Sequence, residues 1–250
     1  MTPGLVSVTF REKTVAEICD ICARAGLKAI EWGGDVHVPP GDLANARAVR
    51  ARSLDAGLSI CAYGSYHRIG APMADFMKNL DAACELGSPA IRVWLGKEGS
   101  AQTDADARAA LMAQLRACCD AARARSVIVA PEFHVGTLTD AIESVRQLLD
   151  ETRDVENLRF YWQPRWDWAE DARLESLALV ATRLMHVHAF TWWHAEGVER
   201  LALKSGAGMW KKALAMLEGA HILLEFVRED SEDALLTDAR TLISWIGGGI

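Results

Sequence analysis

The feature that most constrains the fold is an alternation of short apolar runs with longer amphipathic stretches, which recurs along the whole chain about every 30 residues. The apolar runs predict strands and the stretches between them predict helices, one of which begins with a capping box formed by Thr14 and Glu17. Buried strands joined by helices form a parallel sheet that is covered on both faces. Eight strands are predicted, at residues 5–9, 29–32, 59–63, 90–95, 127–133, 158–163, 184–190 and 221–227.

Eight such units within 250 residues favour a closed (β/α)8 barrel, with the architecture of a TIM barrel, as a single domain over residues 1–250. An open, doubly wound sheet is the alternative. No predicted strand is followed, however, by a Gly-x-Gly-x-x-Gly turn or a phosphate-binding loop. Long loops follow the second, third, fourth, sixth and seventh strands, and in a barrel these loops all lie at the same end.

The composition excludes several classes of partner. With 27 Lys and Arg against 34 Asp and Glu, the formal net charge of −7 argues against a nucleic-acid partner, which needs a basic face. The first residues show no basic segment followed by an apolar one, and no uncharged apolar stretch is long enough to cross a membrane. The six cysteines are not spaced as a disulfide framework and are predicted to be reduced thiols. We therefore expect a cytoplasmic protein with no membrane partner.

Histidines and tryptophans gather where the predicted strands end. In a barrel of this kind the reactive groups lie at the C-terminal ends of the strands and in the loops that follow. Each residue alone suits the half-polar rim of any barrel, but their joint placement predicts a pocket in which flat rings stack on the faces of a sugar. The residues are His37, His67, His134, His186, His188 and His194, with Trp32, Trp94, Trp162, Trp166, Trp168, Trp192 and Trp193.

The fifth to eighth strand ends each carry one candidate metal ligand: Glu132, Gln163, His188 and Glu225. Both glutamates sit in otherwise apolar strands, where an unpaired carboxylate is unstable. An ion pair with Arg92 in the fourth strand is the alternative explanation for one glutamate, but it can hardly serve both. Two carboxylates, an imidazole and an amide oxygen suit a divalent ion such as Mn²⁺, Mg²⁺, Co²⁺ or Zn²⁺.

Three short sequences and one further residue carry a resemblance to a known family: AIEW at residues 29–32, EFHVGT at residues 132–137, HVH at residues 186–188, and Glu225. In these the chain resembles the xylose isomerase-like TIM-barrel superfamily, the sugar phosphate isomerase/epimerase group, over nearly its whole length. The resemblance implies metal ligands at Glu132, His188 and Glu225, while the Asp of the family is matched by Gln163. An amide at that position removes one negative charge and is expected to weaken the hold on a divalent ion.

The resemblance and the candidate site imply a metal-dependent isomerase or epimerase of a small sugar or sugar-like polyol. Glu132 and Glu225 are expected to act as the acid/base pair that moves a proton next to the substrate carbonyl. One alternative is a metal-dependent lyase, a dehydratase or decarboxylase acting on a keto-sugar or inosose; another is a degenerate barrel that binds a sugar without catalysis. The identity of the substrate, a phosphate on it, and the formation of a homo-oligomer are left open. Substrate contacts are expected from Glu31, His67, Trp94, His134 and Trp192.

Overall fold

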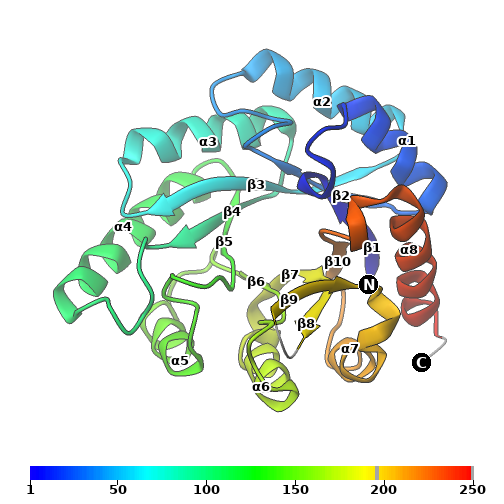
Figure 1. The fold of residues 1–250 in the computed structure, drawn as a ribbon. Coiled ribbons are helices and arrows are strands. Elements are labelled where there is room, and N and C mark those ends of the chain that lie inside the picture. The colour runs from blue at the N-terminus through cyan, green and yellow to red at the C-terminus, as the bar shows by residue number, and fades with distance from the viewer. Residues whose placement is uncertain (195–196, 249–250) are drawn as a thin grey trace.

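Eight parallel strands form a ring around a central axis, with helices outside it (Figure 1). The computed structural model describes residues 1–194 and 197–248. The strands of the ring are β1 (Thr2–Val6), β2 (Ala29–Gly33), β3 (Ser59–Ile69), β4 (Ala90–Leu95), β5 (Ile128–Pro131), β6 (Phe160–Trp162), β7 (Leu184–Ala189) and β10 (His221–Leu224). They follow the order β5-β4-β3-β2-β1-β10-β7-β6, and two single bridges, Val129 to Leu158 and Glu132 to Tyr161, join β5 to β6. The predicted (β/α)8 barrel is confirmed.

Helices connect successive strands and cover the outside of the ring (Figure 1). Thr14 begins the first of them as predicted, because its Oγ1 accepts from Glu17 N and its own N–H donates to Glu17 Oε2. None of the described helices is both long and apolar enough to cross a membrane. The α-helices are α1 (Val15–Ala25), α2 (Leu43–Asp55), α3 (Met73–Leu86), α4 (Ala105–Arg123), α5 (Ile142–Glu151), α6 (Glu170–Val180), α7 (Ala207–Leu214) and α8 (Glu232–Ile246).

The inside of the barrel is lined largely by small side chains. Ala29, Ala62, Ala90 and Ala130 each come from a different strand, are fully buried, and belong to an interior cluster that also contains Tyr161. The larger apolar side chains form a second core between the strands and the helices. Because the alanines occupy little of the interior, charged side chains from opposite strands can reach one another across it.

The first strand differs from its prediction. β1 ends at Val6, and the 3₁₀ helix η1 (Ser7–Phe10) follows where the strand was expected to continue. Apolar residues of a buried 3₁₀ turn resemble those of a strand in a sequence, so the pattern misplaced the end. The turn has a structural use, because Ser7 Oγ accepts a hydrogen bond from Gly33 N at 2.8 Å and ties η1 to the end of β2.

The third strand is longer than predicted and extends to Ile69. Its register with β4 shifts between Gly64 and Arg68. Side chains alternate between the two faces of a strand, so the extension sends Tyr66 toward the axis and His67 toward α3, where the His67 ring meets Phe76 edge-on at 5.3 Å. His67, expected in a loop at the pocket, therefore lies in a strand.

The segment after β7 forms an antiparallel hairpin, β8 (Thr191–His194) with β9 (Gly197–Leu201), where only a long loop was predicted. Short 3₁₀ turns, η2 (Ala181–Arg183), η3 (Leu203–Gly206) and η4 (Arg228–Asp230), mark three other connections. The hairpin lies at the end of the barrel where the strands finish, which we call the mouth. The side chains of Trp193 and His194, two of the candidate pocket residues, lie outside the described part.

Gly4 is predicted to be essential for the spacing of β1 between its neighbours. A Cβ at this position would lie 2.5 Å from the carbonyl oxygen of Ala29 and 2.6 Å from Leu223 Cδ2. We expect Gly4→Ala to lower the free energy of unfolding by about 1–3 kcal/mol, because the carbonyl of Ala29 belongs to the backbone of β2 and cannot move without disturbing that strand. The matched control is Gly208→Ala in α7, where a Cβ meets nothing within 4 Å; it should raise stability by about 0.5–1 kcal/mol. Equal effects in denaturant titrations would contradict the packing argument.

Candidate functional site

Three side chains from different strand ends converge at the mouth: Glu132 after β5, His188 in β7 and Glu225 after β10. His188 Nδ1 lies 3.0 Å from Glu132 Oε1 and 3.5 Å from Glu225 Oε2. One ligand atom from each residue lies within 4.8 Å of the other two, and all three residues are buried. Parallel strands that end at one side of a barrel bring such side chains together, and their atoms are close enough to share one small cation.

The imidazole of His188 is held by Glu31 on β2. His188 Nε2 lies 3.1 Å from Glu31 Oε2, and both side chains are completely buried. Glu31 accepts the Nε2 proton, so a metal ion that displaces the second proton from Nδ1 would meet a lone pair that faces Glu132 and Glu225. Within the described chain Nδ1 has no hydrogen bond of ordinary geometry. A buried nitrogen with a free lone pair beside two carboxylates fits a metal ion, and a carboxylate behind the ring is the usual support of a histidine ligand.

Arg92 and Trp94, both on β4, fix the other oxygen of Glu132. Arg92 NH1 and Trp94 Nε1 both donate to Glu132 Oε2. The guanidinium also donates from Nε to Glu31 Oε1 at 2.9 Å. Arg92 thus pairs with one of the two candidate ligand glutamates, as the alternative explanation required, and its second partner is Glu31. Glu132 Oε1 is left facing His188.

The charge of this cluster can be balanced either by protons or by a further cation. Burial opposes ionisation of Glu132, but Arg92 outweighs it and holds the pKa of Glu132 well below its usual range. Burial raises the pKa of Glu225 to about 7. Burial would lower the pKa of His188, but the carboxylates of Glu225 and Glu31 raise it to about 10. With protons on both His188 and Glu225, the charges of Glu31 and Glu132 are balanced by Arg92 and His188. When both protons leave, two negative charges remain, which a divalent ion balances fully.

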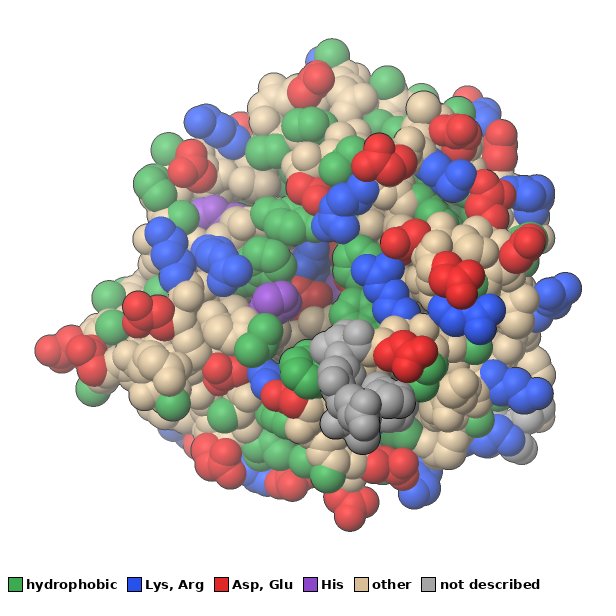
Figure 2. All heavy atoms as spheres, viewed as in Figure 1, with side chains coloured by type: hydrophobic (Ala, Val, Ile, Leu, Met, Phe, Trp, Pro, Cys, Tyr) green, Lys and Arg blue, Asp and Glu red, His purple; other side chains and the backbone are tan. Residues whose placement is uncertain are grey.

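A cavity of about 180 Å³ opens above these groups. Figure 2 shows the mouth hollowed near its centre, where acidic, basic and histidine side chains gather among apolar ones. Gln163 lies in its wall, and since its Nε2 donates to Phe133 O at 2.7 Å, its carbonyl oxygen remains available. The cavity is lined by Val8, Tyr66, Arg92, Trp94, Glu132, His134, Gln163, Trp192, Glu225 and Phe226.

Some of the expected pocket residues meet at this cavity and others do not. Trp94, His134 and Trp192 line it together with the candidate ligands. Glu31 lies beneath it, bonded to His188 and Arg92 rather than facing the opening. His67 lines a different cavity on the outer side of β3.

Two other histidines lie away from the cavity. His186 sits deeper in the barrel, where its Nε2 is 3.0 Å from Cys61 O and burial lowers its pKa to about 4. His37 bonds to Ser7 Oγ through Nδ1 and to Lys13 O through Nε2. The contacts of His37 account for both of its ring nitrogens, whereas those of His186 account for Nε2 but leave Nδ1 without a partner among the described residues.

Two aromatic residues of the cavity were missed. Tyr66 enters it through the unpredicted extension of β3, and its hydroxyl accepts a hydrogen bond from Arg11 NH2 at 2.7 Å. Phe226 follows Glu225 directly and has a positive φ of 47°. Its backbone carbonyl accepts from Trp192 Nε1. Phe226 could have been predicted to line the cavity because it directly follows the candidate ligand Glu225. Tyr66 could have been predicted only if the full length of β3 had been known.

Comparisons with known proteins agree with the barrel fold. The model of the family described as Xylose isomerase-like TIM barrel matches residues 19–245. Among solved structures, the probable 3-DHS dehydratase AsbF of Bacillus anthracis superposes with a TM-score of 0.82 at 19% identity, over 97% of this chain and 98% of that one. The 3-keto-D-glucoside 4-epimerase YcjR of E. coli superposes with a TM-score of 0.72 at 16% identity, over 97% of this chain and 98% of that one. The D-allulose 3-epimerase of Methylomonas sp. superposes with a TM-score of 0.72 at 15% identity, over 98% of this chain and 97% of that one. No curated protein matches the sequence.

Glu31→Gln is predicted to weaken divalent metal binding about 10- to 100-fold, the usual effect of losing the group behind a histidine ligand. The amide can still accept from Arg92 through Oε1, but its NH2 would then face His188 Nε2 and favour the tautomer that carries the proton on Nδ1. Binding of Mn²⁺, measured by calorimetry, tests this. Glu175→Gln is the matched control, because Glu175 is exposed and pairs with Arg146. An unchanged dissociation constant for Glu31→Gln would rule out His188 Nδ1 as a ligand.

Proposed function

Because the chain belongs to the xylose isomerase-like TIM-barrel family, we propose that it is a metal-dependent enzyme that isomerises or epimerises a small sugar or sugar-like polyol. The observation that carries the proposal is the convergence of Glu132 Oε1, His188 Nδ1 and Glu225 Oε2 on one point at the mouth. The known epimerases that superpose on the chain support this class of reaction without fixing the substrate.

Glu132, His188 and Glu225 would hold a divalent ion, Mn²⁺, Mg²⁺, Co²⁺ or Zn²⁺, with Gln163 as a further oxygen ligand. Such an ion would supply a preorganised positive charge for the oxygen of a substrate carbonyl, which lowers the barrier to removing the neighbouring proton. Glu31 and Arg92 keep the ligand side chains in place before anything binds.

The two glutamates would share the proton transfer between them. Glu132 stays ionised because Arg92 and Trp94 hold one of its oxygens, so it is free of a proton but is the weaker base of the two. The pKa of Glu225 is raised to about 7, so its protonation near neutral pH responds more readily than that of Glu132 to a ligand in the cavity. A pair of carboxylates with different proton affinities on two sides of a cavity can remove a proton on one face and return it on the other.

The aromatic wall of the cavity would position the substrate. Trp94 and Trp192 lie in the lining, and their rings suit the C–H faces of a sugar or cyclic polyol. His134, whose ring lies 4.7 Å from that of Trp94, would bond to substrate hydroxyls. A volume of about 180 Å³ fits a small molecule rather than a polymer. A cytoplasmic location remains a prediction of the sequence, which left the formation of a homo-oligomer open.

A lyase is the second candidate, because the probable dehydratase AsbF superposes with a TM-score of 0.82 over nearly the whole chain. Removal of a proton beside a carbonyl is also the first half of a dehydration, so the same residues would serve. Product identity separates the two reactions. The third candidate, a barrel that binds a sugar without catalysis, rests on Gln163 in place of a carboxylate.

Glu132→Gln and Glu225→Gln are predicted to slow exchange of the substrate proton with solvent by about 10²- to 10⁴-fold, because each removes an acid or base. The measurement is deuterium incorporation by the metal-loaded variants over a panel of sugars, inositols and sugar acids. Glu175→Gln should exchange at the wild-type rate. If both site variants also do so, neither glutamate is the base. If the wild type binds no divalent metal tightly and exchanges none of the panel, the non-catalytic candidate stands.

Gln163→Asp is predicted to tighten Mn²⁺ binding about tenfold, because the affinity of an oxygen site rises with the number of charged ligands. The substitution also removes the donor to Phe133 O, so Gln163→Asn serves as a control for side-chain length and should not tighten binding. Equal affinities of the wild type and Gln163→Asp would show that residue 163 does not contact the ion.

A further inference from the structure

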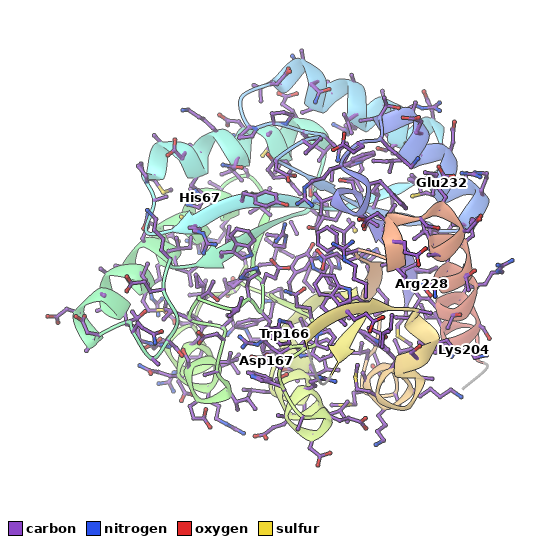
Figure 3. All side chains as sticks on the ribbon, viewed as in Figure 1. His67, Trp166, Asp167, Lys204, Arg228 and Glu232 are labelled. Carbon is purple, nitrogen blue, oxygen red and sulfur yellow. The ribbon has the colours of Figure 1, made fainter. Side chains whose placement is uncertain are left out.

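A second cavity, of about 320 Å³, lies beside the first at the mouth. Its lining includes His67, Arg68 and Lys97, together with Tyr66, which also lines the first cavity. Figure 3 places His67 on β3, on the side of the strand nearer α3 and away from the centre of the mouth. Two cavities that share one aromatic wall can take either two ligands or two parts of one ligand.

His67 is buried in this wall without a partner for one of its nitrogens. The residue is only 5% exposed, and Nε2 makes no hydrogen bond within the described residues. Burial lowers the pKa of the imidazole, so the ring is neutral near pH 7 and can donate from one nitrogen. A buried donor or acceptor without a hydrogen-bond partner destabilises a protein. A ligand oxygen at Nε2 would remove that cost.

The positive charges beside His67 are not neutralised by acidic partners. Arg68 donates from NH1 to Gly96 O at 3.0 Å, and its guanidinium lies 4.4 Å from the ring centre of Trp94. Across the described residues neither Arg68 nor Lys97 pairs with a carboxylate. Asp75 is the acidic residue of the lining, and it lies 3.6 Å from Lys78. Two cations against one carboxylate leave a positive cavity in a chain whose net charge is −7.

We propose that this second cavity binds an oxyanion, a phosphate or carboxylate group, through Arg68, Lys97 and His67. Arg68 offers a planar fork of donors, Lys97 a mobile ammonium and His67 a fixed imidazole, which together match the oxygens of such a group. Asn79, buried on α3, lies in the same lining and adds a polar surface. The anion is either the far end of a substrate that reaches across Tyr66, which rests on the proposed function, or a separate small molecule, which does not.

The second cavity is joined to the candidate metal site by direct contacts. The guanidinium of Arg68 lies over the Trp94 ring, and Trp94 Nε1 donates to Glu132 Oε2. An anion drawn to Arg68 would therefore act on the indole that holds Glu132. This chain of contacts gives the bound anion a route to affect the first cavity whether or not it belongs to the substrate.

Inorganic phosphate and acetate are the probes for the site. We expect wild-type protein to bind one of them with a millimolar dissociation constant by calorimetry, and Arg68→Met and Lys97→Met to bind about tenfold more weakly. Lys28→Met, at an exposed lysine before β2, is the matched control and should bind like the wild type. A crystal soaked with phosphate should show the anion within hydrogen-bond distance of His67 Nε2. No binding of either anion, or binding by Arg68→Met and Lys97→Met as tight as that of the wild type, would overturn the proposal.

The source of the anion is decided by a second measurement on substrates that exchange a proton in the panel above. If the anion belongs to the substrate, Lys97→Met, which leaves the contact between Arg68 and Trp94 in place, raises KM for acidic substrates and leaves KM for uncharged ones unchanged, and phosphate competes with the acidic substrate. If it is a separate molecule, phosphate changes kcat without competing. The titration with phosphate requires no turnover, so the anion site is tested even if the proposed function fails.

Discussion

The structure of the site depends on the guanidinium of Arg92, which is buried inside the barrel between two carboxylates. It holds Glu31 through Nε and Glu132 through NH1, and all three side chains are nearly inaccessible to solvent. Removing one member would leave an uncompensated charge in a region where water cannot replace the lost partner. The same two ion pairs set the position of Glu31 behind His188 and the orientation of Glu132 toward it, so one buried cation organises both sides of the candidate metal site.

This arrangement is possible because the barrel interior is lined by alanines at the positions of four strands. A conventional barrel interior of large branched side chains would fill the space that the charged residues occupy. The interior is therefore a compromise in which some apolar packing is exchanged for a network of ion pairs and hydrogen bonds. The apolar core between strands and helices, which contains the large side chains, supplies the stability that the interior gives up.

The two neighbouring cavities at the mouth differ in the charge of the side chains that line them. The first cavity is acidic at its floor, where Glu132 and Glu225 suit a cation. The second is basic, where Arg68 and Lys97 suit an anion. Tyr66 separates them, and a molecule with a carbonyl at one end and an acidic group at the other would match both. The overall acidity of the chain gives no hint of this, because net charge says little about the sign of a local cavity.

The sequence by itself determined the eight strands and helices and placed Glu132, Gln163, His188 and Glu225 at neighbouring strand ends, because parallel strands in a barrel all finish on one side. The sequence also indicated that Arg92 could form an ion pair with one of the two glutamates. Only the tertiary structure decided that Glu31 supports His188 rather than facing the opening, that Tyr66 and Phe226 join the cavity, and that His67 leaves it. These outcomes depend on where β3 ends and on which side chains meet across the interior. An apolar pattern gives the period of a strand, but its length, its bulges and its partners are set by contacts between residues far apart in the chain.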